Sequence, residues 1–235
     1  MQRKFDFSIG EFYHVYNRGN DKRTIFATTT DYDRFMFLLF VANSKNPVRV
    51  DGLIRKCRAQ GLTLRSVMKE IKRDKTLVNI GAYCLMPNHF HILIHEKEEG
   101  GISLFMQKLA TGYSMYFNKK YERTGSLFEG TFKAEHADKD NYLKYLFAYI
   151  HLNPVKLIEP KWREVGVTNM VRVKKYLKEY KYSSYIDYLG GDREEKLILN
   201  KEAFPEYFEE FKDFEDFINE WIDHNKENSL SLPEV

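Results

Sequence analysis

The stretch MPNHFHIL, from Met86 to Leu93, constrains the fold of this chain more than any other part of the sequence. Successive side chains of a β-strand point to opposite faces, so His89 and His91 would share one face while Phe90 anchors the other in a core. Neutral imidazole is a common metal ligand. The stretch therefore predicts a strand that carries two candidate metal ligands, although two histidines at this spacing also occur by chance.

A second element strengthens the metal-site interpretation. Residues 141–156 have the pattern of a helix, with Asp140 as its N-cap and Pro154 near its end. Spacings of three and four residues place one set of side chains on a single stripe of this helix, namely Tyr142, Tyr145, Tyr149 and Asn153. If this stripe faces the histidine strand, the two elements form one site.

Such a site suits phosphodiester chemistry. Asn153 would give a metal a third, oxygen ligand, and Tyr149 would offer its phenolic oxygen to a phosphate beside that metal. A mixed nitrogen and oxygen ligand set with open positions favours Mg²⁺ or Mn²⁺. Tyrosine, with a reference pKa of about 10, needs a nearby cation or base to act as a nucleophile. Asn153 has an alternative role as a C-terminal helix cap before Pro154.

The remaining pattern predicts an α+β fold. Strands are expected near residues 12–17, 77–85, 89–95 and 131–137, and further helices over residues 31–42 and 102–121. This order places helices against an antiparallel sheet. With 235 residues, of which 43% are hydrophobic, the chain can bury a sizeable core in one domain with extensions.

Several motifs together resemble the single-tyrosine HUH transposases, especially the REP-associated tyrosine transposases. The central pair is His89-Phe90-His91 followed by the helical YIHLNPVK of residues 149–156. Four other stretches agree, namely YHVYNRGN (13–20, running on to Ile25-Phe26), YCLMPN (83–88), GSLFEGTFK (125–133) and YSSY (182–185, with Tyr188 and Gly190). The resemblance covers about residues 10 to 190.

The resemblance implies a ferredoxin-like antiparallel sheet and a DNA-processing activity. Members of the family cut single-stranded DNA near hairpins, and their tyrosine stays joined to the 5′ end while a 3′ hydroxyl is freed. Here Tyr149 would be the nucleophile, with Tyr145 as a fallback, and His89, His91 and Asn153 would hold the divalent metal. The family often has Gln, Glu or Asp where this chain has Asn153. A monomer is expected rather than a dimer.

Charge is distributed unevenly along the chain. The net charge is +3, but residues 201–235 contain eleven acidic residues and three lysines, which leaves +11 on residues 1–200. A basic body is typical of a nucleic-acid binder. Candidate DNA-binding residues in it are Asn17, Arg18, Lys108, Lys119, Lys120, Arg123 and Lys133. For Asn17 and Arg18 the alternative is a β-turn at Gly19, and for the lysines a solvated outer face.

A basic insertion is predicted at about residues 45–75, within a transposase domain that spans residues 1–190. It contains ten Lys or Arg and three acidic residues, and its helical turns carry Arg55 and Lys56 on an outer face. The insertion is either a solvated charged helix or a DNA-gripping subdomain, in which each contact with a phosphate would steepen the salt dependence of binding.

An acidic, aromatic helical extension is predicted for residues 191–235. Its Phe204, Phe214 and Trp221 belong to a stripe that either packs on the body or brings carboxylates over part of a DNA groove. No apolar run approaches the length of a membrane span and no signal-like segment follows Met1, so we expect a cytoplasmic protein without membrane contact.

A competing function is a structured-DNA- or RNA-binding protein that does not cleave. A basic body fits both functions equally well. The joint presence of His89, His91, Tyr149 and Asn153 favours cleavage, because binding alone needs no metal ligands facing a tyrosine. A structural zinc site fits poorly, because such sites usually complete four protein ligands, often with cysteine.

Overall fold

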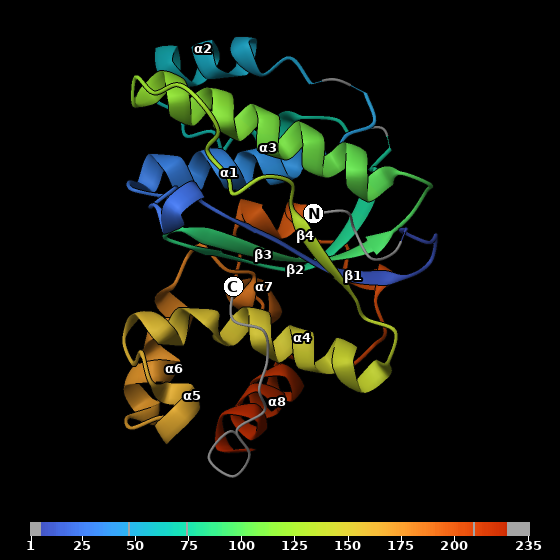
Figure 1. The fold of residues 1–235 in the computed structure, drawn as a ribbon, viewed down its shortest axis with the longest axis vertical. Coiled ribbons are helices and arrows are strands. Elements are labelled where there is room, and N and C mark those ends of the chain that lie inside the picture. Colours follow the sequence, from blue (N-terminus) through green and yellow to red (C-terminus); the bar gives the residue numbers. More distant parts are fainter. Residues whose placement is uncertain (1–5, 47, 74, 209, 225–235) are drawn as a thin grey trace.

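A four-stranded antiparallel sheet forms the centre of the fold in a computed structural model that describes residues 6–46, 48–73, 75–208 and 210–224 (Figure 1). Its strands lie in the order β2-β3-β1-β4. They are β1 (Phe12–Arg18), β2 (Val78–Met86), β3 (His89–Glu96) and β4 (Lys133–His136). With α1 after β1 and α3 after β3, this is the ferredoxin-like arrangement, so the predicted α+β fold class is confirmed.

Helices cover both faces of the sheet (Figure 1). On one side lie α1 (Thr29–Ala42), α3 (Gly101–Lys120) and, outside them, α2 (Val50–Gln60). The other side carries α4 (Asp140–Leu152), α5 (Trp162–Val165), α6 (Met170–Glu179), α7 (Tyr185–Tyr188) and α8 (Phe211–His224). None of the helices within the described ranges combines the length and the apolar character needed to cross a membrane.

The alternation of β3 produces two separate cores. Phe90 and Ile92 pack with α1 and α3 in one hydrophobic cluster, whereas Leu93 packs with α4 in a second cluster on the opposite face. His89 and His91 share the face of Leu93, as the period of two requires. The strand therefore presents both histidines towards α4.

Two details of α4 differ from the sequence prediction. Lys139 is the N-cap, and Asp140 is the first helical residue, where its carboxylate forms an ion pair with Lys144 at 2.9 Å. The α-helix ends at Leu152, and residues 153–157 form a 3₁₀ turn, η3. Pro154 has no N–H to continue the α-helical hydrogen bonds, which accounts for the earlier end.

The basic insertion packs against the body through its own charges. Arg65 forms an ion pair with Glu195 at 2.6 Å, and Lys69 pairs with Glu194 of η4 (Glu194–Ile198). Lys56 of α2 is paired with Glu70 inside the insertion. Part of its positive charge is thus neutralised within the molecule.

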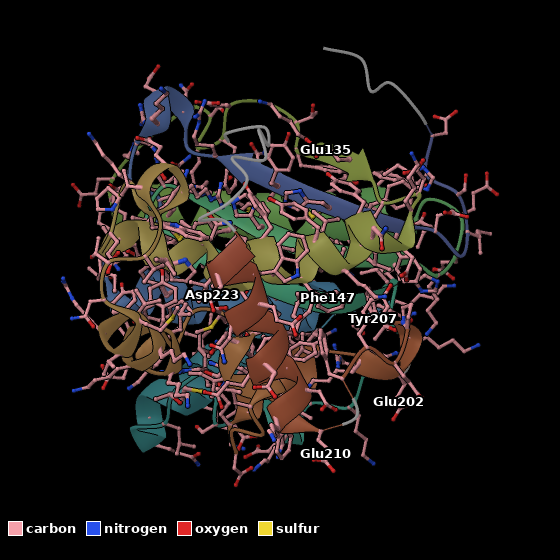
Figure 2. The ribbon with its side chains drawn as sticks, turned by 90° about the horizontal axis from the view of Figure 1, so that it is seen from below. Glu135, Phe147, Glu202, Tyr207, Glu210 and Asp223 are labelled. Carbon is pink, nitrogen blue, oxygen red and sulfur yellow. The ribbon has the colours of Figure 1, made fainter. Side chains whose placement is uncertain are left out.

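The C-terminal extension packs on α4 and the sheet (Figure 2). Phe214, Ile218 and Ile222 of α8 are fully buried in the α4 cluster. Phe204 is also buried, and its ring lies 6.0 Å from that of Phe147 in α4. Residues 225–235, the rest of the predicted acidic extension, lie outside the described residues.

Candidate active site

The histidine strand and the tyrosine helix meet as the sequence predicts. The His91 and Tyr149 rings lie 5.2 Å apart between centroids in an edge-to-face arrangement. His14 of β1 completes a group of three rings, at 5.0 Å from His91 and 5.6 Å from Tyr149. His89 lies 5.0 Å from His91 on the same strand. These side chains form a single site between β1, β3 and α4.

Each histidine of β3 has its Nδ1 engaged by a neighbour. His91 Nδ1 is hydrogen-bonded to His14 Nε2 at 2.9 Å, and His89 Nδ1 donates to Asn88 Oδ1 at 2.6 Å, because the Asn88 amide itself donates to the Lys22 carbonyl. Among the described residues, His91 Nε2 is buried without a hydrogen-bond partner. A buried ring nitrogen in this state fits a metal ligand whose other nitrogen is held by an outer-shell partner.

The protonation states agree with this fit. Burial lowers the pKa of His89 to about 4, with the charges of Lys156, Arg18 and Arg163 acting in the same direction. Burial also lowers the pKa of His91 well below its usual value and that of His14 to about 3. All three rings are therefore neutral near pH 7, which is the form that binds metals.

Asn153 closes the end of α4, which is one of the two roles left open by its position in the sequence. Its Nδ2 donates to the Tyr149 carbonyl at 3.0 Å, as a residue closing the end of α4 does, and this leaves Oδ1 as the candidate ligand atom. Within the described ranges no three His, Cys, Asp or Glu side chains gather as a metal group. Asn153 Oδ1 thus stays the predicted third protein ligand beside His89 and His91.

Tyr149 is better placed than Tyr145 to act as the nucleophile. Tyr149 contacts His91 on one side, while the guanidinium carbon of Arg163 lies 4.7 Å from its ring centroid. Burial raises the pKa of Tyr149, and Arg163 and Asn153 oppose this effect. Tyr145 instead packs against Trp221 at 5.2 Å, and burial raises its pKa far above the usual range.

A carboxylate lies beside the tyrosine stripe. Glu135 of β4, labelled in Figure 2, accepts hydrogen bonds from the hydroxyls of Tyr16 at 3.0 Å and Tyr142 at 2.8 Å. Both of its oxygens are therefore engaged. This explains why Tyr142, although on the predicted stripe, acts as a structural partner of β4.

Two residues predicted to bind DNA lie on the histidine face. Arg18 makes a bidentate contact with Glu129, at 3.0 and 2.9 Å, close enough to His89 to affect its pKa. Lys133 is exposed beside Tyr16. Asn17 is buried instead, donating to the Gly130 carbonyl and accepting from the Arg18 N–H, so its side chain is used inside the fold.

The other candidate DNA-binding residues lie in the helical layer across the sheet. Lys120 of α3 forms an ion pair with Asp31 at 2.6 Å, and Lys108 donates to the Ser44 carbonyl. Arg123, just after α3, donates to Asn118. Lys119 of α3 and Arg55 and Lys56 of α2 share this layer. The structure does not bring these side chains to the site of His89 and Tyr149.

Sequence reasoning missed His14, Lys156 and Arg163 as members of the site. Lys156 lies inside the motif after Tyr149, so its position was visible although its role was not. His14 carries no periodic signal, because its approach to His91 depends on strand register. Arg163 comes from a short helix in an irregular segment, for which the sequence offers no signal.

Comparison with known proteins identifies the class as transposases. Residues 38–153 match the family model described as "Transposase IS200 like". The family resemblance seen in the sequence is thereby confirmed. A solved structure of a REP-associated tyrosine transposase bound to a REP hairpin is 14% identical, with 81% of this chain and 85% of that chain covered and a TM-score of 0.46. No curated protein matches the chain.

Proposed function

We propose that this transposase cleaves and rejoins single-stranded DNA near hairpins, with Tyr149 as nucleophile. The contact between Tyr149 and His91, whose Nε2 is buried without a partner among the described residues, carries the proposal. His89, His91 and Asn153 Oδ1 would hold a divalent ion, Mg²⁺ or Mn²⁺. Bound there, the ion supplies Lewis-acid polarisation of phosphate oxygens. The motif set favours the REP-associated group and a monomer.

The reaction is a transesterification in which Tyr149 replaces the 3′ oxygen of one nucleotide. The phenolic oxygen forms a bond to phosphorus, the bond from phosphorus to O3′ breaks, and the 5′ phosphate stays on the tyrosine. The phenol loses one proton and the departing 3′ oxygen gains one, so the charge of the diester is conserved. A 3′ hydroxyl attacks the phosphotyrosine in the reverse direction to rejoin the DNA.

The decisive test is adduct formation on hairpin-bearing single-stranded DNA from around the gene, with Mn²⁺ or with EDTA. We expect a covalent protein-DNA band that Tyr149→Phe abolishes, since phenylalanine keeps the ring packing but lacks the nucleophilic oxygen. Tyr145→Phe is the matched control and should keep the band.

Each other outcome contradicts a different part of the proposal. An adduct that survives Tyr149→Phe and disappears in Tyr145→Phe would reassign the nucleophile. An adduct in EDTA would remove the metal from the mechanism. Tight binding of many hairpins without any adduct would instead support a structured-DNA- or RNA-binding protein that does not cleave.

A further inference from the structure

Arg163 is a positive charge placed on the proposed nucleophile without a carboxylate partner. Its guanidinium carbon lies 4.7 Å from the centroid of the Tyr149 ring, and it forms no ion pair within the described part of the chain. By contrast, Arg18 and Arg193 each make close contacts with a carboxylate, Glu129 at 2.9 Å and Asp187 at 2.6 Å. Beyond its hydrogen bond to Tyr149, this half-buried guanidinium keeps N–H donors available for an anion.

The segment that carries Arg163 is fixed by its neighbours. Trp162 is 2% exposed within the α4 cluster, and its backbone N–H donates to the Glu159 carbonyl at 3.1 Å. The Glu159 carboxylate accepts from the N–H groups of Thr168 and Asn169, at 2.7 and 3.1 Å. These bonds tie the two ends of the α5 segment together, so Arg163 is held next to Tyr149 by the fold.

The charge of Arg163 acts on both halves of the site. In addition to burial, it lowers the pKa values of His89 and His91 on the strand. On the helix it opposes the rise that burial produces in the pKa values of Tyr145 and Tyr149. Because the Tyr149 ring packs against His91 at 5.2 Å between centroids, a guanidinium 4.7 Å from the centre of the Tyr149 ring lies beside the same site, where a phosphate under attack would have to sit.

We propose that Arg163 binds the phosphate that Tyr149 attacks and presents its phosphorus to the phenolic oxygen. The inference rests on the proposed function. A planar guanidinium matches two phosphate oxygens with parallel hydrogen bonds, which fixes orientation as well as charge. Charge on these oxygens is stabilised best by donors already in place. Arg163 thus acts on the DNA backbone and reads no base.

The test compares Arg163→Gln and Arg163→Lys in the full chain, with Lys161→Gln as a control that makes an equal charge change at an exposed position of the same segment. The rate of adduct formation is measured at saturating hairpin DNA with Mn²⁺. Arg163→Gln should slow it about 100-fold, the effect of losing one preorganised donor. Arg163→Lys, which keeps charge but loses the fork, should recover only part of the rate. Lys161→Gln should match the wild type.

Two further measurements separate phosphate binding from packing against the Tyr149 ring. Guanidinium ion at millimolar concentration should partly restore the rate of Arg163→Ala, and the salt dependence of DNA binding should fall by about one unit of slope in Arg163→Gln. Wild-type rates of adduct formation in both Arg163→Lys and Arg163→Gln would overturn the inference. So would a failure of guanidinium ion to rescue Arg163→Ala together with an unchanged slope of the salt dependence of DNA binding in Arg163→Gln. If Arg163→Gln does not fold, a wild-type rate in Arg163→Lys still overturns it.

The proposed function and this inference fail in different ways. No adduct from the wild-type chain contradicts the function, and the salt slope then still tests Arg163 as a phosphate contact. A wild-type adduct that forms equally fast without Arg163 contradicts the inference alone.

Discussion

His14 and Asn88 select which nitrogen each histidine of β3 presents to the site. Imidazole binds a metal through one nitrogen only when the other carries the proton, and an outer-shell acceptor fixes that choice. Asn88 Oδ1 accepts from His89 Nδ1, and His14 Nε2 lies 2.9 Å from His91 Nδ1. Both pairs leave Nε2 for the metal, so His14 is a positioning residue of the proposed site.

Replacing His14 should therefore weaken metal binding without removing a ligand. We expect His14→Ala to lower the affinity for Mn²⁺ about 10- to 100-fold, the usual effect of losing an outer-shell partner. Titration calorimetry or Mn²⁺ electron paramagnetic resonance on the full chain measures this directly. His95→Ala is the control, since His95 lies on the same strand but pairs with Asn79. Equal affinities for the His14 variant and the wild type would contradict the assignment.

The residues of the site differ in how far sequence alone reveals them. His89 and His91 follow from the strand period of two, and Tyr149 and Asn153 from the helical spacing of four, because these relations are local. His14 reaches His91 only through the register that pairs Tyr16 with His91. Arg163 reaches Tyr149 through a tertiary turn. Register and loop path are set by long-range packing, which no local pattern encodes.

At the scale of elements, the YSSY segment (residues 182–185) links α4 to the sheet by hydrogen bonds. Ser184 Oγ accepts from the Tyr83 N–H at 2.9 Å and donates to His151 Nε2 at 2.7 Å, while His151 Nδ1 donates to the Phe147 carbonyl. All of these polar groups are buried and satisfied. A segment noticed only for its family resemblance thus holds the helix that carries Tyr149.

Element boundaries were less predictable than element types. The predicted helix over residues 141–156 ends at Leu152, because Pro154 stops the hydrogen bonds. The predicted strand over residues 131–137 is confined to Lys133–His136, the part that pairs with β1. The insertion carries α2 as its helical pattern indicated, but its ion pairs with η4 join residues distant in sequence.

The contact between α1 and α3 depends on Asp31, and replacing this residue should destabilise the fold. Asp31 is 0% exposed and accepts from Lys120 at 2.6 Å and Tyr121 at 2.7 Å. Asp31→Asn should lower the free energy of unfolding by about 3 kcal/mol, because the amide loses the charge-assisted hydrogen bonds that the buried carboxylate accepts from Lys120 and Tyr121. Urea unfolding at pH 7 measures this, with exposed Asp51→Asn as the control. Equal losses in the two variants would contradict it.

The pKa of the Asp31 carboxyl also determines how the stability of the fold changes at low pH. Although burial alone would raise the pKa of Asp31, its hydrogen bonds from Lys120 and the tyrosines hold it below the usual value. A depressed carboxyl pKa stabilises the fold fully above the unfolded pKa of about 4, and this stability is lost as pH falls through the folded pKa. The stability gap between wild type and Asp31→Asn should therefore narrow below pH 4.

At the scale of the whole molecule, the acidic extension and the basic body share one core. Lys178 of α6 pairs with Glu215 of α8 at 2.9 Å, and Trp221 contacts Tyr145 one turn from the proposed nucleophile. Glu210, just before α8, and Asp223, near its end, are both exposed (Figure 2). This geometry favours the packing role of the extension over a cover for the DNA groove.

A shared core predicts that α8 unfolds together with the sheet. Ile218 is 1% exposed in the α4 cluster, whereas Phe211, at the start of the same helix, is 61% exposed. Ile218→Ala should lower the free energy of unfolding by about 3 kcal/mol through lost burial and the resulting cavity, and Phe211→Ala should change it by less than about 1 kcal/mol. Both variants should keep a single transition in calorimetry and in urea. A separate early transition in Ile218→Ala, with the main transition unchanged, would mean instead that α8 is an independent cover that can leave α4 without disturbing the transposase fold.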